Sequence, residues 1–324
     1  MKRLQKISHF FTIALLLTFV LSSCVKDDLS DCVKEKRVFF SYKPVTYAST
    51  DVIREGIDPA DITRMNLYIF DENGLFVEEI IDESPVMSPD YYMTIPHLKS
   101  GKYTFVAWGN LQNQYTVSSD MLIPGKTSVK ELQVYLNRIA NKVVNEPLTP
   151  LFYAAHTGEN LEVVSAAENQ KFQLNIVQDT HTINVSVAGV GFEEEKLNNN
   201  TYRLEIYDNN DKFGFDNNFV QSDFFTYSSP CTKEQASETL TSSLTVMRLA
   251  DDRKPKLRIV NDQTGDCLLE EDLVALFLAL RDLGVTIDFS YQHEFTIRYI
   301  FDATTLTVYV NGWKLVREYG ELEF

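Results

Sequence analysis

The sequence has no hydrophobic run long enough to cross a membrane, although it begins with an apolar stretch. That stretch, Phe10 to Leu21, spans only 12 residues, and a membrane-spanning helix needs about 20. Lys2, Arg3 and Lys6 precede it, and small residues follow it. A basic start, a short apolar run and small residues before a cut are typical of a secretory signal peptide, so we expect residues 1–23 to be removed.

A processing signal lies at the predicted cut. Leu21-Ser22-Ser23-Cys24 looks like a bacterial lipobox, in which the cysteine thiol is acylated before cleavage. We therefore expect Cys24 to be the lipidation site and the first residue of the mature protein, with residues 24–36 as a tether. Each buried methylene contributes about 0.8 kcal/mol, so several acyl chains, palmitate among them, hold a protein to the membrane permanently. The alternative is an ordinary secreted protein with a cysteine near the cut.

Positive charge is scarce. The chain has 30 Lys plus Arg against 46 Asp plus Glu, a formal net charge of −16. Without residues 1–23, 27 basic and 46 acidic residues remain, and the net charge becomes −19. Such a chain repels nucleic acid and anionic lipid surfaces, which argues against nucleic-acid partners and against electrostatic membrane docking. The membrane contact that we expect is the lipid on Cys24.

Cysteine is also scarce. Beyond Cys24 the chain has Cys32, Cys231 and Cys267. An odd number of thiols in an oxidising compartment allows at most one disulfide among them. Cys231 and Cys267 are the preferred pair because both lie in the second half of the chain.

Catalytic and metal-binding motifs are missing. The sequence contains no Gly-x-Ser-x-Gly, His-Glu-x-x-His, Cys-x-x-Cys or phosphate-binding glycine loop. Its mature histidines, His97, His156, His181 and His293, have no histidine partner three or four residues away. We interpret them as surface or core residues. The sequence therefore predicts a protein that is not an enzyme, with no cofactor and no metal site.

Aromatic residues are abundant, with 21 Phe and 16 Tyr, and they favour strands. Alternating patterns predict strands over residues 37–42, 62–70 and 75–81, and Asp71-Glu72-Asn73-Gly74 supplies a hairpin turn between the last two. Further strands are predicted over 171–177 and 182–187. One helix is expected over 270–283, where Leu273, Leu276, Phe277 and Leu280 recur with helical spacing and Gly284 follows.

The mature length of 301 residues exceeds what one core usually supports. We expect two domains, an N-terminal one over 37–170 and a C-terminal one over 171–324. Many short strands separated by turns predict a mainly β fold with two antiparallel β-sandwiches in series and the short helix in the second. A single large β-domain is the alternative.

Several segments together resemble one protein family, the FimB-like fimbrial anchor subunits of type V pili. The resemblance spans nearly all of the mature chain, and it is carried by the lipobox at Cys24, Cys32 followed by Arg37–Tyr42, Gly56–Thr63 leading into Leu67–Gly74, Gly101–Asn110 and Val310–Trp313. It implies two transthyretin-like β-sandwich domains, a surface-exposed location on the outer membrane, and a role at the base of a fimbrium with a stalk subunit as partner.

The family also implies an assembly mechanism. Stalk subunits similar to these lose their first strand to an arginine-specific protease, and a neighbour's strand then fills the groove by β-augmentation. We expect an anchor to keep this strand, so that polymerisation stops; the residues concerned here are Arg37, Val38, Phe39, Phe40, Ser41 and Tyr42. The last strand and tail are the candidate donor segment to the stalk subunit, with Leu306, Val308, Val310, Trp313 and Leu315. The alternative is that these residues complete the second sandwich.

Two other functions compete with this interpretation. A stalk or tip adhesin of the same pilus type differs in whether the first strand is removed during maturation. A glycan-binding surface lipoprotein predicts an exposed aromatic platform. Trp108 and Trp313 are the only tryptophans, and their apolar strand contexts favour the core.

Overall fold

The structure is a computed structural model. It describes residues 35–47, 54–95, 98–112, 114–117, 122–138, 143–156, 161–164, 169–189, 201–234, 239–302 and 305–315. Strands dominate these ranges, and within them the chain forms one α-helix, α3 (Leu273–Asp282). No helix in this part of the chain is long and apolar enough to span a membrane. The predicted signal peptide and Cys24 lie outside the described residues.

The first sandwich is built around an eight-stranded sheet. Its order is β5-β4-β7-β11-β13-β1-β6, and β12 pairs with β7. The strands are β1 (Lys36–Ser41), β4 (Met65–Phe70), β5 (Phe76–Asp82), β6 (Tyr92–Ile95), β7 (Gly101–Gly109), β11 (Phe152–Ala155), β12 (Leu161–Val163) and β13 (Gln170–Gln178). Alternate side chains of β1, β4, β7 and β13 enter one apolar core, which includes Val38, Phe40, Leu67, Phe105 and Leu174.

The second sandwich packs two sheets on a larger core. One sheet has the order β18-β19-β14-β22-β23-β24, with β14 (Thr180–Gly189), β18 (Thr232–Glu234), β19 (Thr239–Met247), β22 (Glu294–Asp302), β23 (Thr305–Val310) and β24 (Trp313–Leu315). The other has the order β10-β17-β15-β20-β21, with β10 (Val143–Val144), β15 (Tyr202–Asp208), β17 (Phe225–Pro230), β20 (Lys256–Asn261) and β21 (Cys267–Asp272).

Most neighbouring strands run antiparallel, and the mainly β fold predicted from the sequence is confirmed. Among the described strands three pairs are parallel, namely β1 with β13, β14 with β22, and β10 with β17. Parallel neighbours need long crossover connections, so their partners lie far away in the sequence. Local sequence patterns do not reveal such pairs.

The helix α3 follows the pattern read from the sequence. Its N-cap residue Asp272 accepts a hydrogen bond from Ala275 N at 3.1 Å, and Leu273, Leu276, Phe277 and Leu280 are buried. Gly284 follows it with φ +80°. The helix starts later than predicted because residues 270–272 still pair with β20. The predicted hairpin at Asp71 to Gly74 is also present, between β4 and β5.

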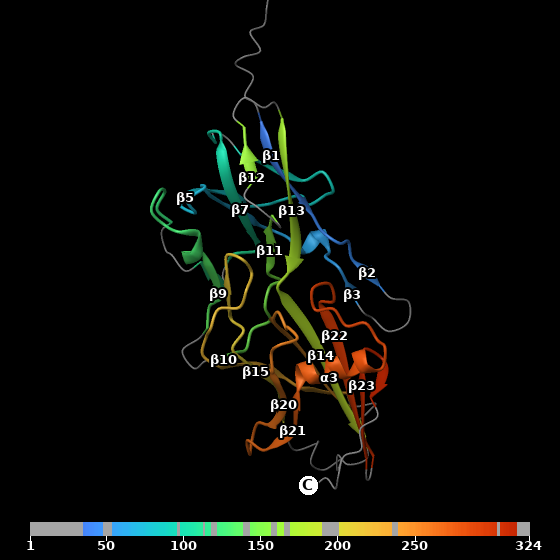
Figure 1. The fold of residues 1–324 in the computed structure, drawn as a ribbon. Helices are drawn as coiled ribbons and strands as arrows, with labels where there is room; N and C mark the ends of the chain where they lie inside the picture. The colour runs from blue at the N-terminus through green and yellow to red at the C-terminus, as the bar shows by residue number, and fades with distance from the viewer. Residues whose placement is uncertain are drawn as a thin grey trace, which may run out of the picture.

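The chain passes from one sandwich to the other at Asp179, between β13 and β14 (Figure 1). The boundary expected between residues 170 and 171 is therefore misplaced. Residues 171–177 and 182–187 read as one pair of strands in sequence, but β13 pairs with β11 and β1, whereas β14 pairs with β19 and β22. Strand β13 thus belongs to the first sandwich.

The first half of the chain also contributes to the second core. Strands β8 (Tyr115–Val117) and β9 (Gln133–Leu136) form a small sheet with β16 (Lys212–Gly214), and β10 joins the sheet of β17. Tyr115, Leu132, Val134 and Leu136 are buried among residues of the second sandwich. The two sandwiches therefore share residues instead of following each other as separate units.

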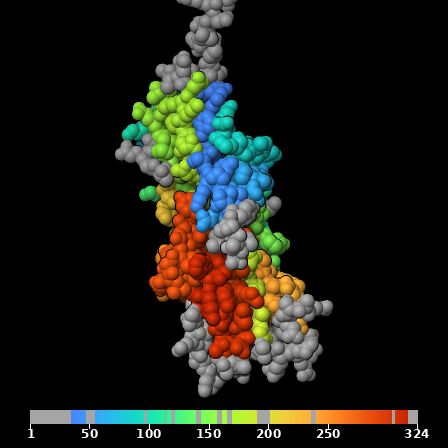
Figure 2. Space-filling model, turned by 90° about the vertical axis from the view of Figure 1, so that its right-hand side faces the viewer, coloured from blue at the N-terminus to red at the C-terminus, as the bar shows by residue number. Residues whose placement is uncertain are grey.

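The molecule is elongated (Figures 1 and 2). Strands β1 and β13 are parallel, and Lys36 and Gln170 pair at their starts. Both starts lie at the end of the molecule far from the second sandwich, whereas the end of β14 and the β20–β21 hairpin lie at the opposite end (Figure 1). The described chain therefore enters at one end of the long axis, and its second sandwich forms the other end.

Candidate anchoring strand and junction between the sandwiches

Strand β1 fills an interior position of the first sheet. It runs parallel to β13 over six residue pairs, from Lys36↔Gln170 to Ser41↔Asn175. On its other side it pairs antiparallel with β6. Val38 is 0% exposed and Phe40 is 1% exposed. The predicted strand is confirmed as β1, which lies between β13 and β6 in the sheet.

Aromatic contacts hold the outward side of β1. The Phe39 and Tyr92 rings lie 5.3 Å apart, and the Arg37 guanidinium lies 4.4 Å from the Tyr92 ring centroid. Arg37 also forms an ion pair with Glu35. The peptide bond after Arg37 therefore lies within a strand that is hydrogen-bonded on both sides, a conformation that a protease cannot bind without opening the sheet.

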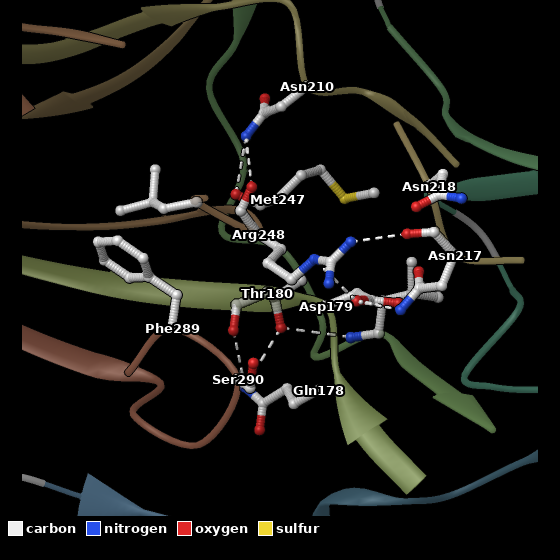
Figure 3. A network of polar contacts seen from close by, with 12 residues as sticks. Gln178, Asp179, Thr180, Asn210, Asn217, Asn218, Met247, Arg248, Phe289 and Ser290 are labelled. Carbon is white, nitrogen blue, oxygen red and sulfur yellow. Dashed lines mark hydrogen bonds and ion pairs between the residues drawn. The ribbon is translucent and has the colours of Figure 1, made fainter. Parts of the chain in front are cut away.

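The junction between the sandwiches is centred on Asp179 (Figure 3). This residue is 0% exposed. Its N–H donates to Leu151 O at 2.7 Å, and its carbonyl accepts from Arg248 N at 2.8 Å. The two backbone bonds connect the crossover to both halves of the molecule, because Leu151 precedes β11 and Arg248 follows β19.

The Asp179 carboxylate binds two partners from the second sandwich. Its Oδ1 lies 3.3 Å from Arg248 Nε and accepts from Asn217 Nδ2 at 3.0 Å. Arg248 Nη2 in turn donates to Asn217 O at 2.7 Å. The guanidinium also packs over the rings of Phe213 and Phe219, at 5.3 and 5.1 Å from their centroids. The carboxylate, the guanidinium and the amide therefore form one closed network.

Burial raises the pKa of Asp179 to about 6, although Arg248 and Asn217 both act to lower it. Desolvation outweighs the ion pair because the carboxyl group is fully buried and its Oδ2 has no hydrogen-bond partner among the described residues. The folded protein therefore holds a proton at this site more tightly than an unfolded chain does.

His181 lies next to this network and is also buried. Its Nδ1 accepts from Leu249 N at 3.1 Å, and its Nε2–H donates to Phe289 O at 3.0 Å. Burial lowers its pKa well below the ordinary value. The ring is thus a neutral core residue with both nitrogens satisfied, as the sequence interpretation expected. Its ring lies 5.8 Å from that of His293, a neighbour that sequence spacing did not reveal.

Three further hydrogen bonds join the sandwiches. Gly56 N donates to Tyr291 O at 2.8 Å, and Gln292 Nε2 donates to Glu55 Oε1 at 3.2 Å. Tyr153 Oη of the first sheet donates to Phe215 O of the second sandwich at 2.9 Å, and Trp108 on the neighbouring strand β7 packs edge-on against the Tyr153 ring. Hydrogen bonds at several positions besides Asp179 therefore hold the two sandwiches together.

The candidate donor segment lies within the second sandwich. Leu306, Val308, Val310 and Leu315 are buried in its core, where β23 pairs with β22 and β24. Trp313 is different, since it is 54% exposed on the edge strand β24. The expectation that both tryptophans belong to the core is wrong for Trp313 and correct for Trp108, which is fully buried. Residues 316–324 lie outside the described chain.

The predicted disulfide is not formed. Cys231 and Cys267 are both free. Cys231 N bonds to Tyr202 on β15, whereas Cys267 pairs with Val260 on β20. Three strand spacings separate the two cysteines, about 14 Å at the usual distance between strands, and a disulfide needs Cα atoms within about 7 Å. Burial raises the pKa of Cys231 to about 12. Cys32 lies outside the described residues.

No group of histidine, cysteine and carboxylate side chains in the described chain could hold a metal ion. The junction is a place where the structure brings buried polar residues together from both sandwiches. Sequence reasoning missed Asp179, which stands in a short polar stretch that reads as a turn. The signal that could have found it is weak: a single acidic residue between two strongly alternating strands.

Comparisons with known proteins agree with this architecture. A family model for the fimbrillin-A associated anchor proteins Mfa1 and Mfa2 matches residues 29–319. The minor fimbrium anchoring subunit Mfa2 of Porphyromonas gingivalis is 25% identical over 312 residues, which cover 92% of this chain and 91% of that protein.

Solved structures show the same fold. The fimbrial anchor protein Mfa2 from Porphyromonas gingivalis superposes with a TM-score of 0.68 at 23% identity, covering 88% of this chain and 99% of that one. A putative polysaccharide binding protein from Bacteroides thetaiotaomicron also gives 0.68 at 23% identity, covering 88% and 98%. The two-sandwich architecture is thus shared along nearly the whole length of both.

The buried carboxyl group makes a pH-dependent contribution to stability. The folded-state pKa of Asp179, about 6, is above its ordinary value of 3.8. The proton on this carboxyl group therefore contributes fully to the unfolding free energy below about pH 3.8, and that contribution is lost as the pH rises through about 6. We expect wild type to lose about 2 kcal/mol of unfolding free energy relative to Asp179→Asn between about pH 4 and pH 7.

Urea unfolding of the two proteins across this range measures the difference directly. Comparing them at each pH cancels the contributions of the other carboxylates. A difference that does not change with pH would mean that the Asp179 carboxyl group is already ionised in the folded protein under acid conditions.

Proposed function

The chain belongs to the family of fimbrillin-A associated anchor proteins Mfa1 and Mfa2, and from that premise we propose that it is an outer-membrane lipoprotein that fastens a type V fimbrium to the cell surface. In this proposal it is a structural protein and not an enzyme. Its fimbrial partner is a stalk subunit, its membrane contact is the lipid on Cys24, and it terminates subunit polymerisation.

The observation that carries the proposal is the position of β1. This strand follows the predicted tether and occupies the groove between β13 and β6. Removing it would leave two unpaired strand edges and would uncover the sites of Val38 and Phe40, each of which contributes about 2 kcal/mol by burial. A groove already filled by the chain's own strand cannot accept one from a neighbour, which accounts for an end to polymerisation.

The tether is tested by removing its lipid attachment site. We expect Cys24→Ala to abolish incorporation of labelled palmitate and to move most of the fimbriae from the cells to the culture medium, because nothing else in the proposal holds the base to the membrane. Electron microscopy and immunoblots of cell and medium fractions measure this.

Cys32→Ala is the matched control, since it removes a thiol from the same N-terminal region without touching the lipobox. It should leave the fimbriae attached. Fimbriae that remain on cells carrying Cys24→Ala would exclude the lipid as the anchor.

Retention of β1 separates an anchor from a stalk subunit or a tip adhesin. We expect the mature surface protein to begin at Cys24 and to contain Arg37 to Tyr42, because the bond after Arg37 is protected within the sheet. Mass spectrometry of the mature N-terminus, together with digestion of the folded protein by an arginine-specific protease, tests this. A surface form that begins at Val38 or at Glu55, after a cut at Arg37 or Arg54, would refute termination by β1.

We further propose that the stalk subunit contacts the edge strand β24. Within the described residues this strand has a neighbour on one side only, β23, and edge strands are open to β-augmentation. Trp313 stands exposed on it, and exposed tryptophan side chains frequently dominate interfaces. In this form of the donor hypothesis, Leu306 to Val310 stay in the core, and β24 with the tail beyond it meets the partner.

Replacing Trp313 tests this contact. We expect Trp313→Ala to weaken binding to purified stalk subunit by about 2 kcal/mol, a factor of about 30 in Kd, without lowering the melting temperature. Phe224→Ala is the control, because Phe224 is similarly exposed but lies next to the other sheet. Equal affinities of wild type and Trp313→Ala would place the stalk contact elsewhere.

A further inference from the structure

A cleft of about 610 Å³ opens beside the junction of the two sandwiches. Its floor is one face of the first sheet, where Tyr153 of β11 lies beside Val177 of β13 and Val106 of β7 lines the same face. The second sandwich supplies one wall through the turn at 215–217 and Arg248, and the loop after α3 supplies Tyr291. The cleft therefore exists only because the two sandwiches are held together.

Its lining combines ring faces with groups that form hydrogen bonds. Tyr153, Phe215 and Tyr291 supply aromatic rings, and Asp216 and Asn217 supply a carboxylate and an amide. Tyr291 is 44% exposed, so its ring is accessible. Asn217 is only 8% exposed, and its Oδ1 has no hydrogen-bond partner among the described residues. Aromatic faces beside planar polar groups suit a ligand with apolar C–H faces and many hydroxyl groups.

Anionic ligands fit this cleft poorly. The cation in its lining, Arg248, already pairs with Asp179 and donates to Asn217 O. Asp216 adds a negative charge to the same wall. A phosphate or carboxylate would therefore meet repulsion without a free cationic partner within the described lining.

An extended peptide also fits poorly. The three floor strands β7, β11 and β13 each have a neighbouring strand on both sides in the sheet. These three strands therefore present side chains to the cleft, so a peptide lying across them could not gain the backbone hydrogen bonds that give β-augmentation its affinity. A ligand held here must be recognised through side chains alone.

We propose that this cleft is a binding site for a neutral oligosaccharide. Its volume suits a ligand of about two or three sugar units. Tyr291 and Phe215 pack against the C–H faces of the sugar rings, and the carboxylate of Asp216 binds hydroxyl groups. The site goes beyond the anchoring role, because it gives the base of the fimbrium a contact with glycan at the cell surface.

The test uses the full mature chain and neutral probes of defined structure: maltotriose, mannotriose, xylotriose and chitotriose. Saturation-transfer NMR detects binding, and calorimetry measures it at up to about 10 mM probe, which reaches Kd values near 1 mM. We expect at least one probe to bind. Tyr291→Ala and Asp216→Asn should each weaken that binding about tenfold or more, whereas Tyr291→Phe should retain most of it.

Tyr207→Ala is the matched control. Tyr207 is 41% exposed and stacks on Phe224 at 5.0 Å, away from the cleft, so it forms an alternative aromatic platform. The proposal is overturned if none of the four probes binds, if binding survives Tyr291→Ala and Asp216→Asn, or if Tyr207→Ala abolishes it. Fimbriae should remain attached to cells carrying Tyr291→Ala, so a failure of this site and a failure of the anchoring role give different results.

Discussion

The buried contact between Asp179 and Arg248 is the interaction on which the arrangement of the two sandwiches depends. A fully buried carboxylate is costly to desolvate, and its pairing with a guanidinium at 3.3 Å does not fully compensate for that cost. The raised pKa of Asp179 is the direct consequence of this imbalance. Such a pair adds little net stability, but breaking it by moving the second sandwich would leave the buried carboxyl group without Arg248 and Asn217.

The shared core makes the same arrangement rigid. Tyr115, Leu132, Val134 and Leu136 of the first half pack among side chains of the second sandwich, and Trp108 of β7 contacts Phe213 of β16 across the junction. Bending the molecule at Asp179 would expose these apolar surfaces to water. At about 25 cal/mol per Å² of apolar area, uncovering even a few large side chains costs several kcal/mol. The crossover is thus a fixed joint, and the cleft beside it is held open by the same contacts.

The sequence predicts correctly the elements that depend on neighbouring residues. Periodicity and turn chemistry are enough to predict the hairpin at Asp71 to Gly74, the strand at Arg37 to Tyr42 and the helix near Leu273. Sequence reasoning failed where the partner is distant. Strand β13 alternates as regularly as β14, and nothing in either pattern states that their partners lie in different sheets. The pairing of Cys231 with Cys267 failed for the same reason, since their positions in the chain do not reveal the two strands that separate them.

The exposure of Trp313 and the cleft at the junction also depend on distant parts of the chain, so local sequence patterns do not reveal them. A tryptophan in an apolar strand usually enters the core, but β24 is an edge strand and Trp313 faces outward. The cleft joins residues from β7, β11 and β13 with Asp216, Arg248 and Tyr291, which lie far apart in sequence. Such a site has no motif, because its members are brought together only by the crossover at Asp179.

The parallel pairing of β1 with β13 has a mechanical consequence under the proposed anchoring role. Tension from the lipid acts at the start of β1, at Lys36, whereas tension from the fimbrium reaches β13 at its other end, through Asp179. Forces applied at opposite ends of two parallel neighbours shear all of their hydrogen bonds at once. An antiparallel partner in the place of β13 would be loaded at the same end and would open one bond at a time. The buried side chains of Val38 and Phe40 add to this resistance, since β1 cannot slide without drawing both out of the core.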